Sequence, residues 1–157
     1  MTALPQSGRL EGGVHLYPVH IYYEDTDAGG VVYYANYLKF VERGRTEALR
    51  AVGVTHATLL ERDGIALAVH KLTAEYLSPA RLDDDLTIAT RITAVTGATM
   101  MLDQKIARDA TPLFASTCTI VCVGKSGKAV RLPAALAAAL DKLNPATTLQ
   151  MVKTHAR

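Results

Sequence analysis

The sequence has little net charge and no long apolar run. Its 157 residues carry a net charge of +2, and the basic residues are scattered, which is not the electrostatic footprint of a nucleic-acid-binding protein. No apolar run approaches the roughly 20 residues that a membrane-spanning helix needs, and no run of Lys or Arg marks a membrane surface. The polar, glycine-rich start lacks the regions of a signal peptide. We therefore expect a cytoplasmic protein without a nucleic-acid partner or an integral membrane segment.

Cysteine is also scarce. The two cysteines, Cys118 and Cys122, lie four residues apart in a stretch expected to be a strand. Residues at this spacing point to one face of a strand but lie too far apart to form a disulfide. Without further ligands the pair is not a zinc site either. Both are expected to be small buried residues.

The remaining composition is that of a globular protein. Apolar residues make up 49% of the chain and charged residues 20%, which at this length predicts one domain with a substantial core. We expect the domain to span residues 14–145. A flexible segment is expected at 1–13 and a flexible tail at 146–157.

The first half of the chain predicts one strand and one long helix. Residues 14–25 have the β-branched and aromatic content of a strand. Between Tyr33 and Val52, apolar or small residues recur close to every 3.6 positions, which predicts the helix. Gly44 lies on the apolar side of this helix, where it costs about 1 kcal/mol relative to Ala. We therefore expect a close neighbour there, such as a sheet.

The second half is mostly strand-like. A short helix is expected at 55–64 and a terminal helix at 133–144, and between them four strands are separated by short turn signals. Short connections predict antiparallel neighbours. One long helix against an antiparallel sheet is an α+β arrangement. Five strands around a single helix leave sheet edges free, and pairing two edges in a dimer would satisfy them.

Residues 21–37, IYYEDTDAGGVVYYANY, hold five of the seven tyrosines and three acids. Asp27 lies just before the expected helix, whose free N–H groups could hold a carbonyl oxygen and stabilise an oxyanion. The Asp27 carboxylate could attack that carbonyl or activate a water, and Gly30 allows the chain to turn. The same residues could also form only a turn and a helix cap. A divalent-cation site is a third reading, although the spacing differs from a Ca²⁺ loop.

Two blocks resemble a known family. Residues 22–54 resemble the signature of the hotdog-fold acyl-CoA thioesterases, in the 4-hydroxybenzoyl-CoA thioesterase-like superfamily, and are most similar to the Tol–Pal-associated acyl-CoA thioesterases. Residues 72–88, LTAEYLSPARLDDDLTI, resemble a second block of that family. The resemblance covers residues 15–143 and implies a five-stranded antiparallel sheet wrapped around one long helix. It further implies hydrolysis of a short-chain aliphatic or aromatic acyl-CoA to free acid and CoA.

The resemblance also implies roles for particular residues. Asp27 matches the catalytic carboxylate, the backbone N–H of Tyr34 matches the group that polarises the thioester carbonyl, and Gly30 matches the glycine of the turn between them. The Tol–Pal-associated proteins usually have His where this chain has Tyr34, whereas the 4-hydroxybenzoyl-CoA enzymes have Tyr. The family needs no metal or other cofactor. Its members imply a homodimer or homotetramer with sites at the dimer interface.

Other residues are candidates for substrate binding. The resemblance places CoA contacts near the last strand, where Lys125, Lys128 and Arg131 offer the charges that phosphates require. A solvated basic loop is the simpler alternative. His70 is a candidate pocket residue, although a lone strand His is more often an ordinary side chain. Glu42 lies beside the apolar stripe of the long helix, where a solvated position is expected.

A second class of function remains open at this point. The chain could be a non-catalytic or weakly catalytic partner of acyl carrier protein or of envelope and phospholipid-synthesis proteins. Substantial thioester hydrolysis that depends on Asp27 would distinguish the enzyme from the binding protein. A hotdog dehydratase needs a catalytic His beside an acid, and no His stands at the expected helix start.

Overall fold

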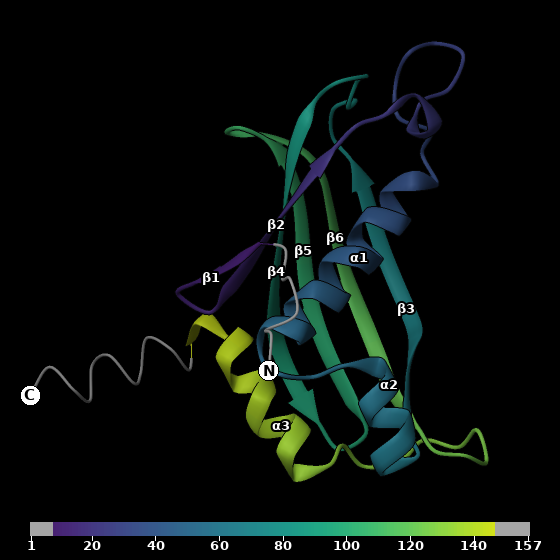
Figure 1. Ribbon diagram of the computed structural model, residues 1–157, viewed down its shortest axis with the longest axis vertical. Coiled ribbons are helices and arrows are strands. Elements are labelled where there is room, and N and C mark those ends of the chain that lie inside the picture. Colours follow the sequence, from purple (N-terminus) through teal and green to yellow (C-terminus); the bar gives the residue numbers. More distant parts are fainter. Residues whose placement is uncertain (1–7, 147–157) are drawn as a thin grey trace, which may run out of the picture.

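The computed structural model describes residues 8–146. Of the expected flexible segments at 1–13 and 146–157, residues 1–7 and 147–157 lie outside the described residues. One antiparallel sheet has the order β1-β2-β4-β5-β6-β3, and α1 lies across one of its faces (Figure 1). The strands are β1 (Arg9–Glu11), β2 (Val14–His20), β3 (Ala66–Tyr76), β4 (Asp85–Thr96), β5 (Thr99–Arg108) and β6 (Thr111–Val123).

The helical elements are few and follow the predicted order. The long helix is α1 (Asn36–Ala51), the short one is α2 (His56–Thr58) continued by a π-helical turn, and the terminal one is α3 (Ala134–Leu140). Short 3₁₀ turns occur at Tyr23–Asp25 and Asp141–Leu143. No helix within residues 8–146 combines the length and apolar character that crossing a bilayer requires.

The predicted α+β arrangement is confirmed, because every strand pair is antiparallel. The β4–β5 hairpin closes with Thr96 opposite Thr99, and Gly97 between them adopts a φ of +54° that favours glycine. The sheet has six strands rather than the expected five. The additional strand is β1, which lies in the lead-in segment expected to be flexible and pairs with β2.

Two predicted boundaries were wrong. The first strand ends at His20 rather than near residue 25, because Tyr23–Asp25 turn into a 3₁₀ helix. The long helix begins at Asn36 rather than at Tyr33. Tyr33 is instead held outside the helix, since its N–H donates to the Asp25 carbonyl at 3.0 Å. At the other end Gly53 has a φ of +86°, as expected for a helix C-cap region.

Gly44 explains why α1 can lie so close to the sheet. A Cβ at this position would come within 2.8 Å of Ile88 Cγ2 and 3.3 Å of Gln104 Nε2. The predicted close neighbour is therefore confirmed. The short helix also ends as expected, at Gly64 with a φ of +65°.

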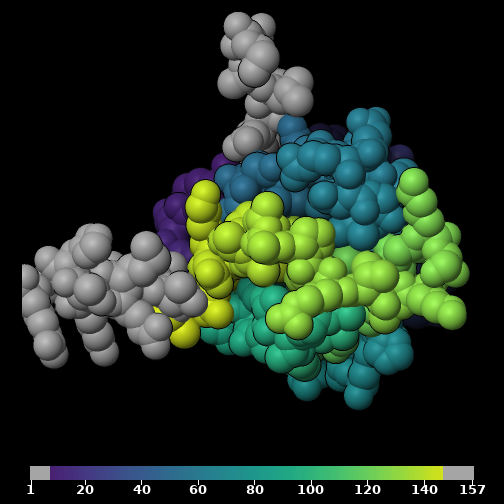
Figure 2. All heavy atoms as spheres, turned by 90° about the horizontal axis from the view of Figure 1, so that it is seen from below, coloured from purple at the N-terminus to yellow at the C-terminus, as the bar shows by residue number. Residues whose placement is uncertain are grey.

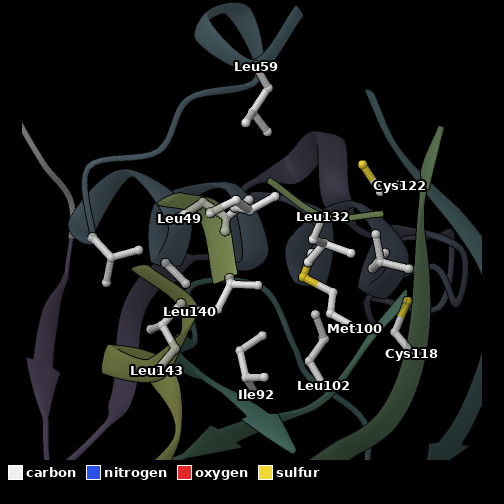
Figure 3. Close-up of a cluster of buried hydrophobic side chains, with 14 of the residues drawn as sticks. Leu49, Leu59, Ile92, Met100, Leu102, Cys118, Cys122, Leu132, Leu140 and Leu143 are labelled. Atoms are coloured by element: carbon white, nitrogen blue, oxygen red, sulfur yellow. The ribbon is translucent and has the colours of Figure 1, made fainter. Parts of the chain in front are cut away.

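The far end of α1 is closed by α3. Leu140 and Leu143 pack into a buried cluster with Leu49 and Ile92 (Figure 3). Viewed from this end, α3 and the segment leading to it spread across the molecule between the α1–α2 region and the strand ends (Figure 2). Cys118 and Cys122 are free and buried in the same cluster, which confirms their prediction as small core residues.

Candidate active site

Asp27 opens a tight turn between the 3₁₀ helix and α1. The Asp27 N–H donates to the Val31 carbonyl at 2.9 Å, and the Gly30 N–H donates to the Asp27 carbonyl at 3.1 Å. Gly30 has a φ of +79°, which only glycine adopts without strain. The Asp27 carboxylate accepts from the N–H of Gly29 at 2.8 Å and of Val31 at 3.4 Å. The backbone thus holds an exposed carboxylate in one orientation.

This turn is braced against the rest of the fold. The Val32 N–H donates to the Ala80 carbonyl at 2.9 Å, and the Ala80 N–H donates to the buried Tyr37 hydroxyl at 3.0 Å. On the other side, Asn36 Nδ2 donates to the Asp25 carbonyl at 2.9 Å. Two segments resembling the family's two blocks therefore support one another.

The residues just before α1 leave backbone donors available. Within the described residues, the Tyr34 N–H has no hydrogen-bond partner, and no side chain caps the helix start. The Tyr34 carbonyl accepts from the Tyr76 hydroxyl at 2.9 Å, which fixes the next peptide unit, and the Tyr33 carbonyl, in the same peptide as the Tyr34 N–H, accepts from the Asn36 N–H at 2.9 Å. Burial, helped by the neighbouring Tyr34 and Tyr37, raises the pKa of Tyr76, so its hydroxyl remains a donor at neutral pH. The arrangement combines a carboxylate with free N–H donors, as carbonyl chemistry requires.

The tyrosines of this region serve different purposes. Tyr37 is 3% exposed and stacks on Phe114 with ring centroids 5.3 Å apart. Tyr23 and Tyr34 are 83% and 63% exposed. Tyr34 makes edge contacts with Tyr76, so an exposed aromatic surface surrounds the Asp27 turn.

The three acids do not converge. Asp25 Oδ2 accepts from the Tyr22 N–H at 2.9 Å, while Asp27 faces its own turn. Tyr23–Asp25 form a 3₁₀ helix rather than a continuation of the strand. In the part of the chain that the structure describes, no three His, Cys, Asp or Glu residues are grouped to hold a metal ion.

A cavity of about 130 Å³ lies farther along α1, between the helix and the sheet. Most of its walls are apolar, and Arg45 is a charged residue that lines it. The lining also includes residues of β3, β4, β5 and β6, His56 of α2, and Leu143 of the last 3₁₀ turn. This cavity is the second feature of the fold that could accept a small group.

Comparison with known proteins identifies the chain's family. A sequence model described as the thioesterase-like superfamily matches residues 22–140. The chain belongs to this superfamily. It is 45% identical over 129 residues to an acyl-CoA thioesterase YbgC of Haemophilus influenzae, covering 81% of this chain and 94% of that protein. An acyl-CoA thioester hydrolase YbgC of Escherichia coli O6:H1 is 46% identical over 108 residues, covering 68% of this chain and 80% of that protein.

Solved structures agree with this membership. A probable thioesterase from Bartonella henselae superimposes with a TM-score of 0.74 at 36% identity, covering 76% of this chain and 99% of that chain. A 4-hydroxybenzoyl CoA thioesterase complexed with 4-hydroxybenzoyl CoA has a TM-score of 0.75 over 81% of this chain and 98% of its own, but at 20% identity it supports the fold alone. The hotdog fold is confirmed, and this superfamily member is a thioester hydrolase.

Within one copy of this thioesterase, the basic candidates for substrate binding and the Tyr34 region lie at opposite ends of β3. Val123 pairs with Ala66 at the start of β3, so the loop with Lys125, Lys128 and Arg131 follows that end. Tyr76, which contacts Tyr34, lies at the other end (Figure 1). The 11 residues of β3 span about 36 Å. His70 is exposed at an irregularity in the middle of the strand.

Three residues of the thioesterase were not singled out from the sequence. Tyr76 and Asn36 hold the backbone around Tyr34, and Arg45 lines the cavity. Tyr76 stands in the second family-like block, so that block carried a signal for it. Arg45 read as an ordinary polar residue of the helix, and only the fold reveals that it is partly buried.

Proposed function

We propose that the protein hydrolyses short-chain aliphatic or aromatic acyl-CoA thioesters to free acid and CoA. Relatives that are 45% and 46% identical are named acyl-CoA thioesterase and acyl-CoA thioester hydrolase. The observation that carries the proposal is that the Asp27 carboxylate lies in the same braced segment as the Tyr34 N–H, which has no partner among residues 8–146. A fixed carboxylate and a free helix-start donor are the two groups that acyl transfer needs.

In this mechanism the thioester oxygen accepts a hydrogen bond from the Tyr34 N–H. That donor stabilises the negative charge that develops on the oxygen as the carbonyl carbon is attacked. Asp27 either removes a proton from an attacking water or attacks the carbon itself. In the first route the C–S bond breaks and the thiolate leaves as CoA after protonation. In the second route the C–S bond breaks as the carboxylate attacks, and the CoA thiolate leaves and is protonated; water then hydrolyses the acyl-aspartyl anhydride, which releases the free acid and regenerates the carboxylate.

We further propose that the working unit contains two copies paired through β3. This strand is 11 residues long and ends the sheet, and an unprotected edge of that length favours pairing. Exposed apolar side chains follow the same edge, including Val69 at 52% and Leu77 at 50%. A symmetric pair of antiparallel edges has the self-complementary form typical of homodimers.

This pairing would join the separated candidates. With two β3 strands antiparallel, the end of one strand that carries Tyr76 lies beside the beginning of the other. The loop with Lys125, Lys128 and Arg131 would then approach the Asp27 turn of the second copy. These cations would contact the phosphates of CoA, and His70 would lie near the shared axis. A tetramer made of two such dimers is compatible with the proposal.

The test measures thiol release from acyl-CoAs of short, long and benzoyl type, for the wild type and for Asp27→Asn. We expect hydrolysis of at least one short or aromatic substrate and a loss of about 10²-fold or more in kcat for the variant. Its circular dichroism and Tm should match the wild type. Inactivity of the wild type on all thioesters, or an active Asp27→Asn, would overturn the catalytic proposal. A protein that instead binds acyl carrier protein would then be the better description.

A further inference from the structure

The cavity along α1 has the size of a small acyl group. Its volume of about 130 Å³ is close to that of an apolar cavity of about 150 Å³ that accepts benzene. Apolar walls come from Leu49, Ile92 and Met100, and the strand residues Leu67 and Val69 line the side nearest the free β3 edge. A six-carbon chain or a single ring would fit this space.

We infer that this cavity receives the acyl group of the substrate and that Arg45 selects acyl groups bearing a hydroxyl or carboxylate oxygen. The inference deepens the proposed function and rests on it. It assigns to Arg45 a role in specificity and leaves the chemical step to Asp27 and the Tyr34 N–H.

The environment of Arg45 supports this role. Its Nη1 donates to Gln104 Oε1 at 3.1 Å, and no carboxylate within residues 8–146 lies at ion-pair distance from its guanidinium. A guanidinium has five N–H donors, and withdrawing it from water is unfavourable unless acceptors replace the water. An oxygen on the ligand would supply such an acceptor.

Gln104 holds Arg45 in place. It is fully buried, and its Nε2 donates to the Val41 carbonyl at 2.8 Å and to Thr90 Oγ1 at 2.9 Å. These two acceptors fix the orientation of the amide, so that Oε1 faces Arg45. The guanidinium is therefore anchored by a rigid core residue, as specificity requires.

The rim of the cavity is polar as well. Thr46 Oγ1 donates to Glu42 Oε1 at 3.2 Å and lies 3.3 Å from His56 Nε2. Glu42 therefore accepts from Thr46, and its charge acts on the Arg45 guanidinium from beyond ion-pair distance. The lining of the cavity thus combines polar donors and acceptors with apolar walls.

The thioester would come from the second copy. Tyr34 and Arg45 of one chain are 11 residues apart, or about 17 Å along a helix, which a short acyl group cannot span. Antiparallel pairing of two β3 edges brings the helix start of one copy toward Leu67 and Val69 of the other. The acyl group held at one copy's Asp27 would then enter the other copy's cavity.

The experiment compares hexanoyl-CoA with 3-hydroxyhexanoyl-, 6-hydroxyhexanoyl- and adipyl-CoA. For the wild-type dimer we expect kcat/KM to favour at least one oxygen-bearing substrate about tenfold over hexanoyl-CoA, because hydrogen bonds to charged groups contribute that much. Arg45→Met should abolish this ratio, and Arg45→Lys should restore part of it. Preference for a hydroxyhexanoyl-CoA would indicate that Arg45 binds a neutral hydroxyl, and preference for adipyl-CoA would indicate that it binds an anionic carboxylate.

The controls separate this inference from the proposed function. Arg62→Met removes an exposed cation and should leave the ratio unchanged. If the wild type hydrolyses hexanoyl-CoA through Asp27 but shows no preference, or if Arg45→Met keeps the preference, the inference fails and the proposed function stands.

Inactivity on all thioesters would instead overturn the proposed function. Binding of hexanoate, 6-hydroxyhexanoate and adipate to the wild type and Arg45→Met, followed by nuclear magnetic resonance, then decides the inference on its own. Tighter binding of an oxygen-bearing acid that is lost in the variant supports it. Equal affinities contradict it.

Discussion

The two ends of α1 are built by different means. At its start, backbone hydrogen bonds from Asp27 to Val31 and from Val32 to Ala80 hold a turn that remains open to solvent. At its far end, apolar side chains such as Leu140 and Leu143 close the fold by packing. A carboxylate can be oriented by backbone donors without being buried, whereas the far end depends on the hydrophobic effect for its stability.

This contrast separates chemistry from stability. Changes at the open end should alter kcat more than folding, whereas changes to packed side chains outside the cavity lining, such as Leu140, should alter folding more than kcat. This difference does not require a flexible turn, because the Asp27 turn is held by its own backbone hydrogen bonds. The following variants probe the division, beginning with the largest expected effect.

Leu140→Ala should lower the free energy of unfolding by about 2–5 kcal/mol, because Leu140 is fully buried and its loss leaves a cavity. Denaturant unfolding measures the change. Leu60→Ala, at a side chain that is 59% exposed, is the matched control and should change the value by less than about 0.5 kcal/mol. A fall in kcat for Leu140→Ala, measured while the protein remains folded, would contradict the prediction that this residue serves stability rather than catalysis.

Tyr37→Phe should destabilise the protein by about 1–3 kcal/mol, because the buried N–H of Ala80 loses its acceptor. Since that bond also braces the Asp27 turn, kcat should fall in the same variant. Tyr23→Phe, at the most exposed tyrosine of this region, is expected to have neither effect. Thermal unfolding and thiol release on both variants provide the comparison, and an unchanged Tm for Tyr37→Phe would contradict it.

Tyr76→Phe should reduce kcat about tenfold or less with little change in Tm, because its hydroxyl holds the Tyr34 carbonyl at the solvent-exposed end. KM should change little, since the hydroxyl bonds the backbone next to the proposed oxyanion donor rather than CoA. Steady-state kinetics separate the two constants. A rise in KM with unchanged kcat would indicate that Tyr76 acts on substrate binding instead.

The hydrogen bonds of His20, near the open end, predict a small dependence of stability on pH. Hydrogen bonds first to Asp85 and then to Asp83 raise the pKa of His20 above its ordinary value of 6.5. The protonated form is therefore favoured by folding, so its stabilisation is fully present below pH 6.5 and is lost as the pH rises through the raised pKa. The Tm difference between the wild type and His20→Gln should shrink over that window. A Tm difference that grows with pH would contradict a raised pKa for His20 in the folded protein.

The sequence was informative where one local rule determines the structure. The helical period of α1, the turn glycines and the strand around Cys118 and Cys122 were all predicted, because each depends on neighbours along the chain. The additional strand β1 was missed because its pairing with β2 is set by tertiary contacts rather than by composition. The helix start at Asn36 was misplaced because Tyr33 bonds back to Asp25.

The candidate site was predictable only in part. Asp27, Gly30 and Tyr34 lie in one continuous segment, so the sequence could suggest how they meet. Tyr76 and Arg45 reach their positions through partners 42 and 59 residues away along the chain, which no local pattern encodes. In the proposed dimer, the placement of the basic loop relative to Asp27 depends on the second copy, and a single sequence does not specify that geometry.

We propose that each site combines the open end of one copy with the far end of the other. Mixing two inactive variants tests this pairing. One carries Asp27→Asn and the other Lys125→Glu, Lys128→Glu and Arg131→Glu, and the two are unfolded together, refolded and assayed for thiol release. In a hybrid dimer one site has both intact halves, so random pairing should restore about a quarter of wild-type activity. Activity no higher than that of the unmixed variants would show that each site lies within one chain and would contradict the account.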